Sequence, residues 1–175
     1  MVTDAAELAE LTRALVGHRA HLGQPLPPIG AMIETPASAL LAESLARQAD
    51  FFSIGSNDLS QYALAMDRGH PELARRLDAL HPAVLRLIAL VAEAGRTHAK
   101  PVSLCGALGS DADALPLLVG LGVHEVSAAP ASIPQLKRVA RSLDASECRE
   151  WARQALELDS SGAVRSLMAR ARGSA

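Results

Sequence analysis

Apolar and polar positions follow one repeating order along most of this chain: a short apolar run, a polar or glycine-containing turn, and a segment with helical spacing. Short apolar runs bounded by turns indicate strands, whereas apolar residues every three or four positions indicate amphipathic helices. The apolar runs lie at residues 29–34, 51–56, 101–108 and 124–129. Four successive strand–helix units predict an α/β fold with a parallel sheet that is buried on both faces.

The number of strands leaves two architectures open. A complete (β/α)8 barrel takes about 250 residues and eight strands, whereas this chain has 175 residues. A small open α/β sheet needs no more than four strands with their helices. The spacing therefore predicts either half of a barrel or an open α/β domain, and both bind ligands where strands end and helices begin.

The helical segments follow from the same periodicity. The first is expected at residues 4–22, where one side carries Leu8, Leu11, Leu15 and Leu22. Thr35 is a suitable N-cap and Pro36 a suitable first residue for a helix that runs to about Ala49. Further helices are expected near Leu59, from Pro82, through residues 115–119, 133–143 and 145–158, and in a tail at 163–172 that we expect to fray.

Composition excludes several classes of function. Formal net charge is -2, and neither a basic tract nor an acidic tail is present, so we expect no nucleic-acid partner. No apolar run approaches the roughly 18 residues of a membrane span, and the first residues lack a signal-peptide pattern. The two cysteines are far apart in unlike settings, which favours reduced thiols and a cytoplasmic location.

Polar or reactive side chains stand at the end of each predicted strand. Because the carboxyl ends of parallel strands meet at one edge of a sheet, we expect these residues to lie near one another. They are Glu34, the Asn57–Asp58 pair, Cys105 with Gly106, and Ser127, while Arg68 follows the second strand on a loop.

Each of the acidic candidates has two interpretations. Glu34 and Asp58 can offer oxygens to magnesium, which takes one or two protein carboxylates together with water and phosphate oxygens. Equally, Glu34 can be a surface residue before a helix, and Asp58 can be an N-cap that forms a capping box with Gln61.

The remaining candidates are likewise open. Asn57 can hold a phosphate or carboxylate oxygen or cap a helix, and Arg68 offers a forked donor for the same anions or lies in solvent. Cys105 can give a proton to a carbanion or be a small buried hydrophobe. Cys148 lies on a helix stripe and supports only the buried interpretation, and none of the six histidines is spaced as part of a metal pair.

Taken in order, five stretches resemble a known family. They are GAMIETPASALLAE, DFFSIGSNDLSQYALAMDR, HPAVLRLI, LCGALGSD and LPLLVGLGVHEVSAAPASIP. Together they resemble the C-terminal, phosphoenolpyruvate-binding barrel of Enzyme I of the bacterial phosphotransferase system, in the form fused into multiphosphoryl transfer proteins for sugar uptake. The resemblance covers residues 28–143, which correspond to the last four strands of that barrel.

The resemblance implies a set of roles. Glu34 and Asp58 match the magnesium ligands, Asn57 and Arg68 the phosphoenolpyruvate contacts, and Cys105 the donor that protonates the enolate to pyruvate. In the family, a histidine of a separate domain receives the phosphoryl group and passes it toward a carrier protein. This sequence departs where the family usually has an acid, since Ala107 follows the cysteine–glycine pair.

The same resemblance predicts organisation and partners. We expect an N-terminal helix and linker at residues 1–27, a half-barrel at 28–143, and a helical tail at 144–175. A half-barrel exposes sheet edges and apolar surface, so association with a second copy or with the missing half-barrel is expected. Two alternatives stay open: a non-catalytic remnant or dimerisation module, and a barrel fragment of the pyruvate phosphate dikinase or phosphoenolpyruvate synthase type.

Overall fold

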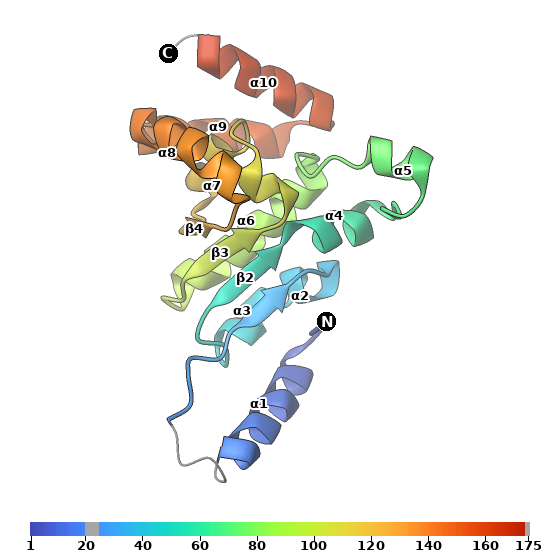
Figure 1. The fold of residues 1–175 in the computed structure, drawn as a ribbon, viewed down its shortest axis with the longest axis vertical. Coiled ribbons are helices and arrows are strands. Elements are labelled where there is room, and N and C mark those ends of the chain that lie inside the picture. The colour runs from blue at the N-terminus through green and yellow to red at the C-terminus, as the bar shows by residue number, and fades with distance from the viewer. Residues whose placement is uncertain (20–24, 174–175) are drawn as a thin grey trace.

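A parallel sheet lies at the centre of the computed structural model, which describes residues 1–19 and 25–173. Within these residues the sheet has four strands in the order β1-β2-β3-β4, so neighbours in sequence are neighbours in space (Figure 1). A doubly wound open sheet reverses its strand order at a switch point, whereas a barrel keeps it. The fold is therefore α/β, a partial (β/α)8 barrel, and of the two predicted architectures the half-barrel is confirmed.

Every described strand is followed by helical structure, as the repeating pattern predicts. The elements are α1 (Ala5–Arg19), β1 (Ala31–Ile33), α2 (Pro36–Leu40), α3 (Ala42–Ala46), β2 (Phe52–Gly55), α4 (Ser56–Leu64), α5 (Pro71–Arg76), α6 (Pro82–Thr97), β3 (Val102–Cys105), the 3-10 turn η1 (Ala107–Ser110), α7 (Leu115–Leu121), β4 (Glu125–Val126), η2 (Pro130–Ser132), α8 (Ile133–Ser142), α9 (Ala145–Glu157) and α10 (Ser161–Gly173).

Only one face of the sheet is packed, so the expectation of burial on both faces is wrong. Successive strand side chains point to opposite faces, and those toward the helices are fully buried: Phe52, Ile54, Val102 and Leu104. The opposite face carries Met32, Ser53 and Ser103, which are paired in register, and Met32 is 44% exposed. Four strands are half the number that closes this barrel, and no described strand lies opposite to cover this face.

One predicted helix differs in detail from the structure, and one helix was missed. The helix expected from Pro36 to Ala49 is interrupted at Leu41, which ends α2 and precedes α3. Its start is confirmed: the Thr35 hydroxyl accepts a hydrogen bond from the Ser38 amide at 3.1 Å in a reciprocal capping box. Helix α5 was not predicted, because none of its residues is buried and it has no apolar stripe.

Helix α1 lies beside the β1 end of the sheet and buries little of its predicted apolar side (Figure 1). Leu8 is buried against the core, whereas Leu11 and Leu15 are 53% and 50% exposed. The fourth residue of the predicted stripe, Leu22, lies outside the described residues. The described helices include none that is long and apolar enough to cross a membrane.

The C-terminal helices pack onto the core. On α9, Cys148, Ala152 and Ala155 are buried; on α10, the buried residues are Val164, Leu167 and Met168. The expectation that residues 163–172 fray is therefore wrong for the described part of this segment, because its apolar side is covered. Arg165 of α10 also forms a two-pronged ion pair with Asp78, with Nε–Oδ2 and Nη2–Oδ1 distances of 2.8 Å.

Low pH is expected to weaken the attachment of α10, because its ion pair with Asp78 requires an ionised carboxylate. Burial raises the pKa of Asp78, but hydrogen bonds from Arg165 and the Leu80 amide lower it more, so its net pKa lies below the ordinary value. The resulting stabilisation is present above the unfolded pKa near ~4 and is lost as pH falls through the folded pKa. Asp78→Asn should cost about 1 kcal/mol at pH 7, since Arg165 is half exposed and solvent screens the pair.

Urea unfolding at pH 7 and pH 3 measures this effect. The gap in stability between Asp78→Asn and the unaltered protein should narrow at pH 3, because this pH lies below the unfolded pKa of the carboxylate and its stabilisation is lost as pH falls toward the folded pKa. Glu72→Gln on the exposed helix α5 is the matched control and should follow the unaltered protein at both pH values. An equal loss of stability at both pH values would contradict the assignment.

Candidate functional site

The carboxyl ends of β1, β2 and β3 bring the predicted site residues to one rim of the sheet. Ile33 pairs with Ile54, and Gly55 pairs with Cys105, so the next residue after β1, Glu34, enters the same row. This row lies at the end of the open face, which in a complete barrel is the catalytic end. The predicted convergence of Glu34 and Cys105 at one rim is thus what the register produces.

Gly55 provides the space that Glu34 occupies. A Cβ atom at Gly55 would lie 2.9 Å from the Glu34 Cβ and 3.2 Å from its carboxylate Oε2. The Glu34 side chain therefore lies against the end of β2, one residue before α4 begins. Among the described residues, Glu34 has no hydrogen-bond or ion-pair partner, which leaves its carboxylate available to a ligand.

Helix α4 starts directly after β2, so Asp58 stands in its first turn. The N-cap position is Gly55, without a side-chain capping bond, and the proposed Asp58–Gln61 capping box is wrong. The Gln61 side chain instead accepts hydrogen bonds from Arg68, from the main-chain amide at 3.0 Å and from Nε at 3.1 Å. The carboxylate of Asp58 therefore takes no part in capping α4.

Arg68 returns to this rim through an ion pair. Its Nη2 donates to Asp58 Oδ1, while Gln61 holds its amide and Nε from the same helix. The side chains of Arg68 and Asp58 are 40% and 28% exposed, so a ligand can reach both. A fork held in this way suits a phosphate or carboxylate group.

Asn57 fastens α4 to the segment after β3. Its side-chain Oδ1 accepts a hydrogen bond from the Ala107 amide at 2.9 Å, rather than capping its own helix. Beside it, the Ser56 hydroxyl donates to the Cys105 carbonyl at 2.6 Å. Sequence reasoning missed Ser56, whose role depends on a contact 49 residues away.

Gly106 makes this junction possible. Its φ of +96° and ψ of -170° lie in a region that residues with a side chain rarely adopt. A Cβ atom there would come within 2.5 Å of Ser56 Oγ and 2.9 Å of Asn57 Oδ1. The close approach of backbone that the glycine predicts is therefore present, and it is directed at α4.

The two cysteines have different environments. Cys105 ends β3 on the open face and is half-buried, so its interpretation as a buried hydrophobe is wrong. Cys148 is fully buried in α9, and burial raises the pKa of its thiol, with the nearby Asp144 and Glu147 charges adding to the effect. Cys105 is the thiol that a substrate on the rim can reach.

The acidic residues on this rim suit a metal that shares its coordination with a ligand. Among the described residues, no group of three or more His, Cys, Asp or Glu side chains can enclose an ion. Magnesium commonly takes one or two protein carboxylates, with waters and phosphate oxygens completing its shell. Glu34 and Asp58 fit that donor set, and a closed protein cage is not required.

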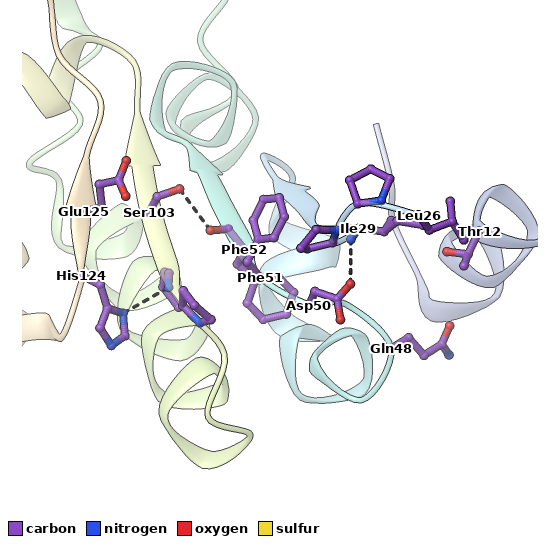
Figure 2. A pocket seen from close by; sticks show the side chains of 14 residues that line it. Thr12, Leu26, Ile29, Gln48, Asp50, Phe51, Phe52, Ser103, His124 and Glu125 are labelled. Carbon is purple, nitrogen blue, oxygen red and sulfur yellow. Dashed lines mark hydrogen bonds between the residues drawn. The ribbon is translucent and has the colours of Figure 1, made fainter. Parts of the chain in front are cut away.

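A cavity with no predicted site residue lies at the other end of the strands. It has a volume of about 920 Å³ and is lined mainly by residues just before and at the starts of the strands, including Ile29, Phe51 and His124. Figure 2 shows some of its polar groups bonded within the protein: Asp50 accepts a hydrogen bond from the Ile29 amide, and His124 Nδ1 accepts one from the Val102 amide. Barrel enzymes place their chemistry at the carboxyl ends of the strands, so this cavity is not the candidate site.

A comparison with protein families assigns the chain. The family model described as "PEP-utilising enzyme, PEP-binding domain" matches residues 1–145. This chain belongs to the PEP-utilising enzyme family. The suspected resemblance is confirmed, and the matched region contains every predicted site residue.

Curated relatives support the same family. The chain is 47% identical over all of its length to a multiphosphoryl transfer protein of Xanthomonas campestris, of which it covers 21%. It is 43% identical over 80% of its length to a phosphoenolpyruvate-protein phosphotransferase of Buchnera aphidicola, of which it covers 24%. It also matches a multiphosphoryl transfer protein of Rhodobacter capsulatus at 41% identity. The chain thus spans only about a fifth to a quarter of the length of these relatives.

Proposed function

We propose that this chain is the C-terminal half of the catalytic barrel of a phosphoenolpyruvate-protein phosphotransferase, acting in a sugar phosphotransferase system of the cytoplasm. The observation that carries the proposal is the rim itself: Glu34, the Asp58–Arg68 pair and Cys105 lie at adjacent strand ends of a family member. The relatives are a multiphosphoryl transfer protein and a phosphoenolpyruvate-protein phosphotransferase, which favours this reaction over that of a dikinase or synthase.

Binding of phosphoenolpyruvate would use two positive charges, a magnesium ion and the guanidinium of Arg68. Glu34 and Asp58 would hold magnesium, which when bound supplies positive charge to phosphate and enolate oxygens. Arg68, oriented by Gln61, would donate its fork to the phosphate or carboxylate group of the ligand. The Oδ1 of Asn57 accepts a hydrogen bond from the Ala107 amide. Its side-chain nitrogen, Nδ2, would therefore be the atom that donates a hydrogen bond to phosphoenolpyruvate.

Proton delivery would fall to Cys105. When the phosphoryl group passes to the acceptor histidine of a separate domain, the bonding pair stays on oxygen and gives the enolate of pyruvate. The Sγ–H of Cys105 would protonate the terminal carbon, and the thiolate would then recover a proton from solvent. Ala107 places no acid beside this thiol, so its orientation depends on the contacts of the main chain.

Calorimetry of the chain with phosphoenolpyruvate tests the binding site. Binding is expected only with magnesium, and Asp58→Asn should weaken it at least about tenfold, because charge-assisted contacts contribute roughly 1.5–3 kcal/mol. Asp67→Asn is the matched control, since within the described part of the chain this carboxylate accepts a hydrogen bond from the Gly69 amide of its own turn and has no other partner. Binding that ignores both magnesium and Asp58 would contradict the site assignment.

A second candidate function is a non-catalytic association module of the same family. The open sheet face, with Met32 exposed, and the exposed Leu11 and Leu15 of α1 favour it, because these surfaces suit a second copy or the missing half-barrel. This candidate predicts concentration-dependent self-association in the same samples without any phosphoenolpyruvate binding.

A further inference from the structure

A small cavity lies behind the hydrogen bond that joins Asn57 to Ala107. It has a volume of about 200 Å³, and its walls come from the start of α4, the loop before α6 and the segment after β3. Arg165 of the C-terminal helix α10 also lines it. A helix distant in sequence therefore reaches the back of the candidate site.

Arg165 joins two segments that border this cavity. Its Nε and Nη2 contact both carboxylate oxygens of Asp78 at 2.8 Å, and its Nη1 lies 3.6 Å from Asp111 Oδ2. The guanidinium is planar and rigid, so simultaneous contact sets the spacing of the two carboxylates. The hydrogen bonds with Asp78 raise the pKa of Arg165, which keeps it charged.

Asp111 ends the segment that begins beside Cys105. Within residues 106–111, the Gly109 amide donates to the Gly106 carbonyl and the Asp111 amide to the Leu108 carbonyl, both at 3.2 Å. The segment is held near its start by the Ala107–Asn57 hydrogen bond and at its end by the ion pair of Asp111 with Arg165. Between these two contacts, the Ser110 hydroxyl accepts a hydrogen bond from the Ala129 amide at 3.0 Å. Loss of the Arg165 contact therefore removes the ion pair at the end of the turn and leaves the hydrogen bonds to Asn57 and Ala129.

We propose that Arg165 is a positioning residue of the candidate site, which holds residues 106–111 and thereby the main chain that carries Cys105. Its consequence for chemistry rests on the proposed function. Helix α10 lies beyond residues 1–145, which the family model matches, so the family match does not account for this contact. Proton delivery should depend on Arg165 more than ligand binding does, because Glu34 follows β1, Asp58 lies on α4 and Arg68 lies on the loop after α4. Within the described residues, these three side chains have no hydrogen bond to residues 106–111, whereas Asn57 bonds the Ala107 amide.

Two variants distinguish positioning of residues 106–111 by Arg165 from simple attachment of helix α10 to the core. Arg165→Ala removes the contacts with both Asp78 and Asp111. Asp111→Asn removes only the negative charge at the end of residues 106–111 and leaves the Arg165–Asp78 pair in place. An asparagine also keeps the oxygen that accepts from the Asp113 amide. The matched control is Arg153→Ala, whose guanidinium pairs with Glu150 and Glu157 on the surface of α9.

Two measurements follow each variant. Amide hydrogen exchange of residues 106–111 should become about fivefold faster in Arg165→Ala and in Asp111→Asn, the change expected for losing a partly exposed ion pair. With magnesium present, the exchange of pyruvate methyl hydrogens for solvent deuterium should become about three- to fivefold slower in both variants. This factor is close to the roughly fivefold change in amide exchange, because both follow from loss of the same ion pair. The Kd for phosphoenolpyruvate should stay within about twofold, and Arg153→Ala should change none of these values.

The outcomes distinguish the two proposals. Unchanged amide exchange of residues 106–111 in both variants would overturn the role of Arg165, as would a loss of phosphoenolpyruvate affinity equal to the loss of pyruvate exchange. If the unaltered protein neither binds phosphoenolpyruvate nor exchanges pyruvate, the proposed function fails. Faster amide exchange of residues 106–111 in the two variants would then still support the conclusion that Arg165 stabilises this segment.

Discussion

Cys105→Ala should slow the exchange of pyruvate methyl hydrogens by roughly 10²–10⁴-fold, the range that a positioned general acid or base contributes. Removal of a proton from pyruvate is the reverse of enolate protonation, so the same thiol serves both directions. Cys105 stands on the open face at the end of β3, where a ligand on the rim can meet it. Nuclear magnetic resonance of pyruvate in deuterated buffer with magnesium measures the rate.

The second cysteine provides the control. Cys148 is fully buried on α9 and away from the rim, so Cys148→Ala should leave the exchange rate nearly unchanged, although it will cost some stability. Phosphoenolpyruvate binding should survive in Cys105→Ala, because the proposed ligands of the phosphate and metal are other residues. Exchange that persists at the original rate without Cys105 would remove the thiol from the proposed mechanism.

Gly106→Ala should destabilise the protein by about 2–6 kcal/mol. The backbone conformation alone costs roughly 1–3 kcal/mol for a residue with a side chain, and crowding adds about 1–3 kcal/mol. The added methyl would lie 2.5 Å from Ser56 Oγ and 2.9 Å from Asn57 Oδ1. Relief of this clash breaks the contacts that fasten β3 to α4, so affinity for phosphoenolpyruvate should fall as well.

Urea unfolding and calorimetry together check this expectation. Gly162→Ala, in the first turn of α10, is the matched control: no heavy atom lies within 4 Å of its added methyl, and it should stay within about 0.5 kcal/mol of the unaltered protein. Equal stability of the Gly106 and Gly162 variants would contradict the packing described at this junction.

Local patterns were enough to predict most of the elements. The strands of this chain are short apolar runs with turns at their ends, and Thr35 with Pro36 identifies the start of α2 before any contact is known. The strand ends also mark Glu34, Asp58 and Cys105, because a parallel sheet collects its carboxyl ends at one edge. Helix α5 escaped prediction since it buries no residue and so has no apolar periodicity.

Partners that lie far apart in sequence were beyond such reasoning. The Asp58–Gln61 spacing fits a capping box, yet Gln61 accepts from Arg68 because α4 begins two residues before Asp58. The tail at 163–172 was expected to fray, yet Val164 and Met168 are fully covered and Arg165 pairs with Asp78, 87 residues away. Spacing along one element does not reveal which surface it meets.

By itself, the sequence determined the α/β class, the parallel strands, the family resemblance and the residues of the rim, since periodicity and motifs are local properties. The tertiary structure decided the rest. Strand order distinguished the half-barrel from the open sheet, and register put Glu34 in line with Cys105. Packing left one face of the sheet open and brought Arg165 to the back of the site, because both depend on how distant segments share space.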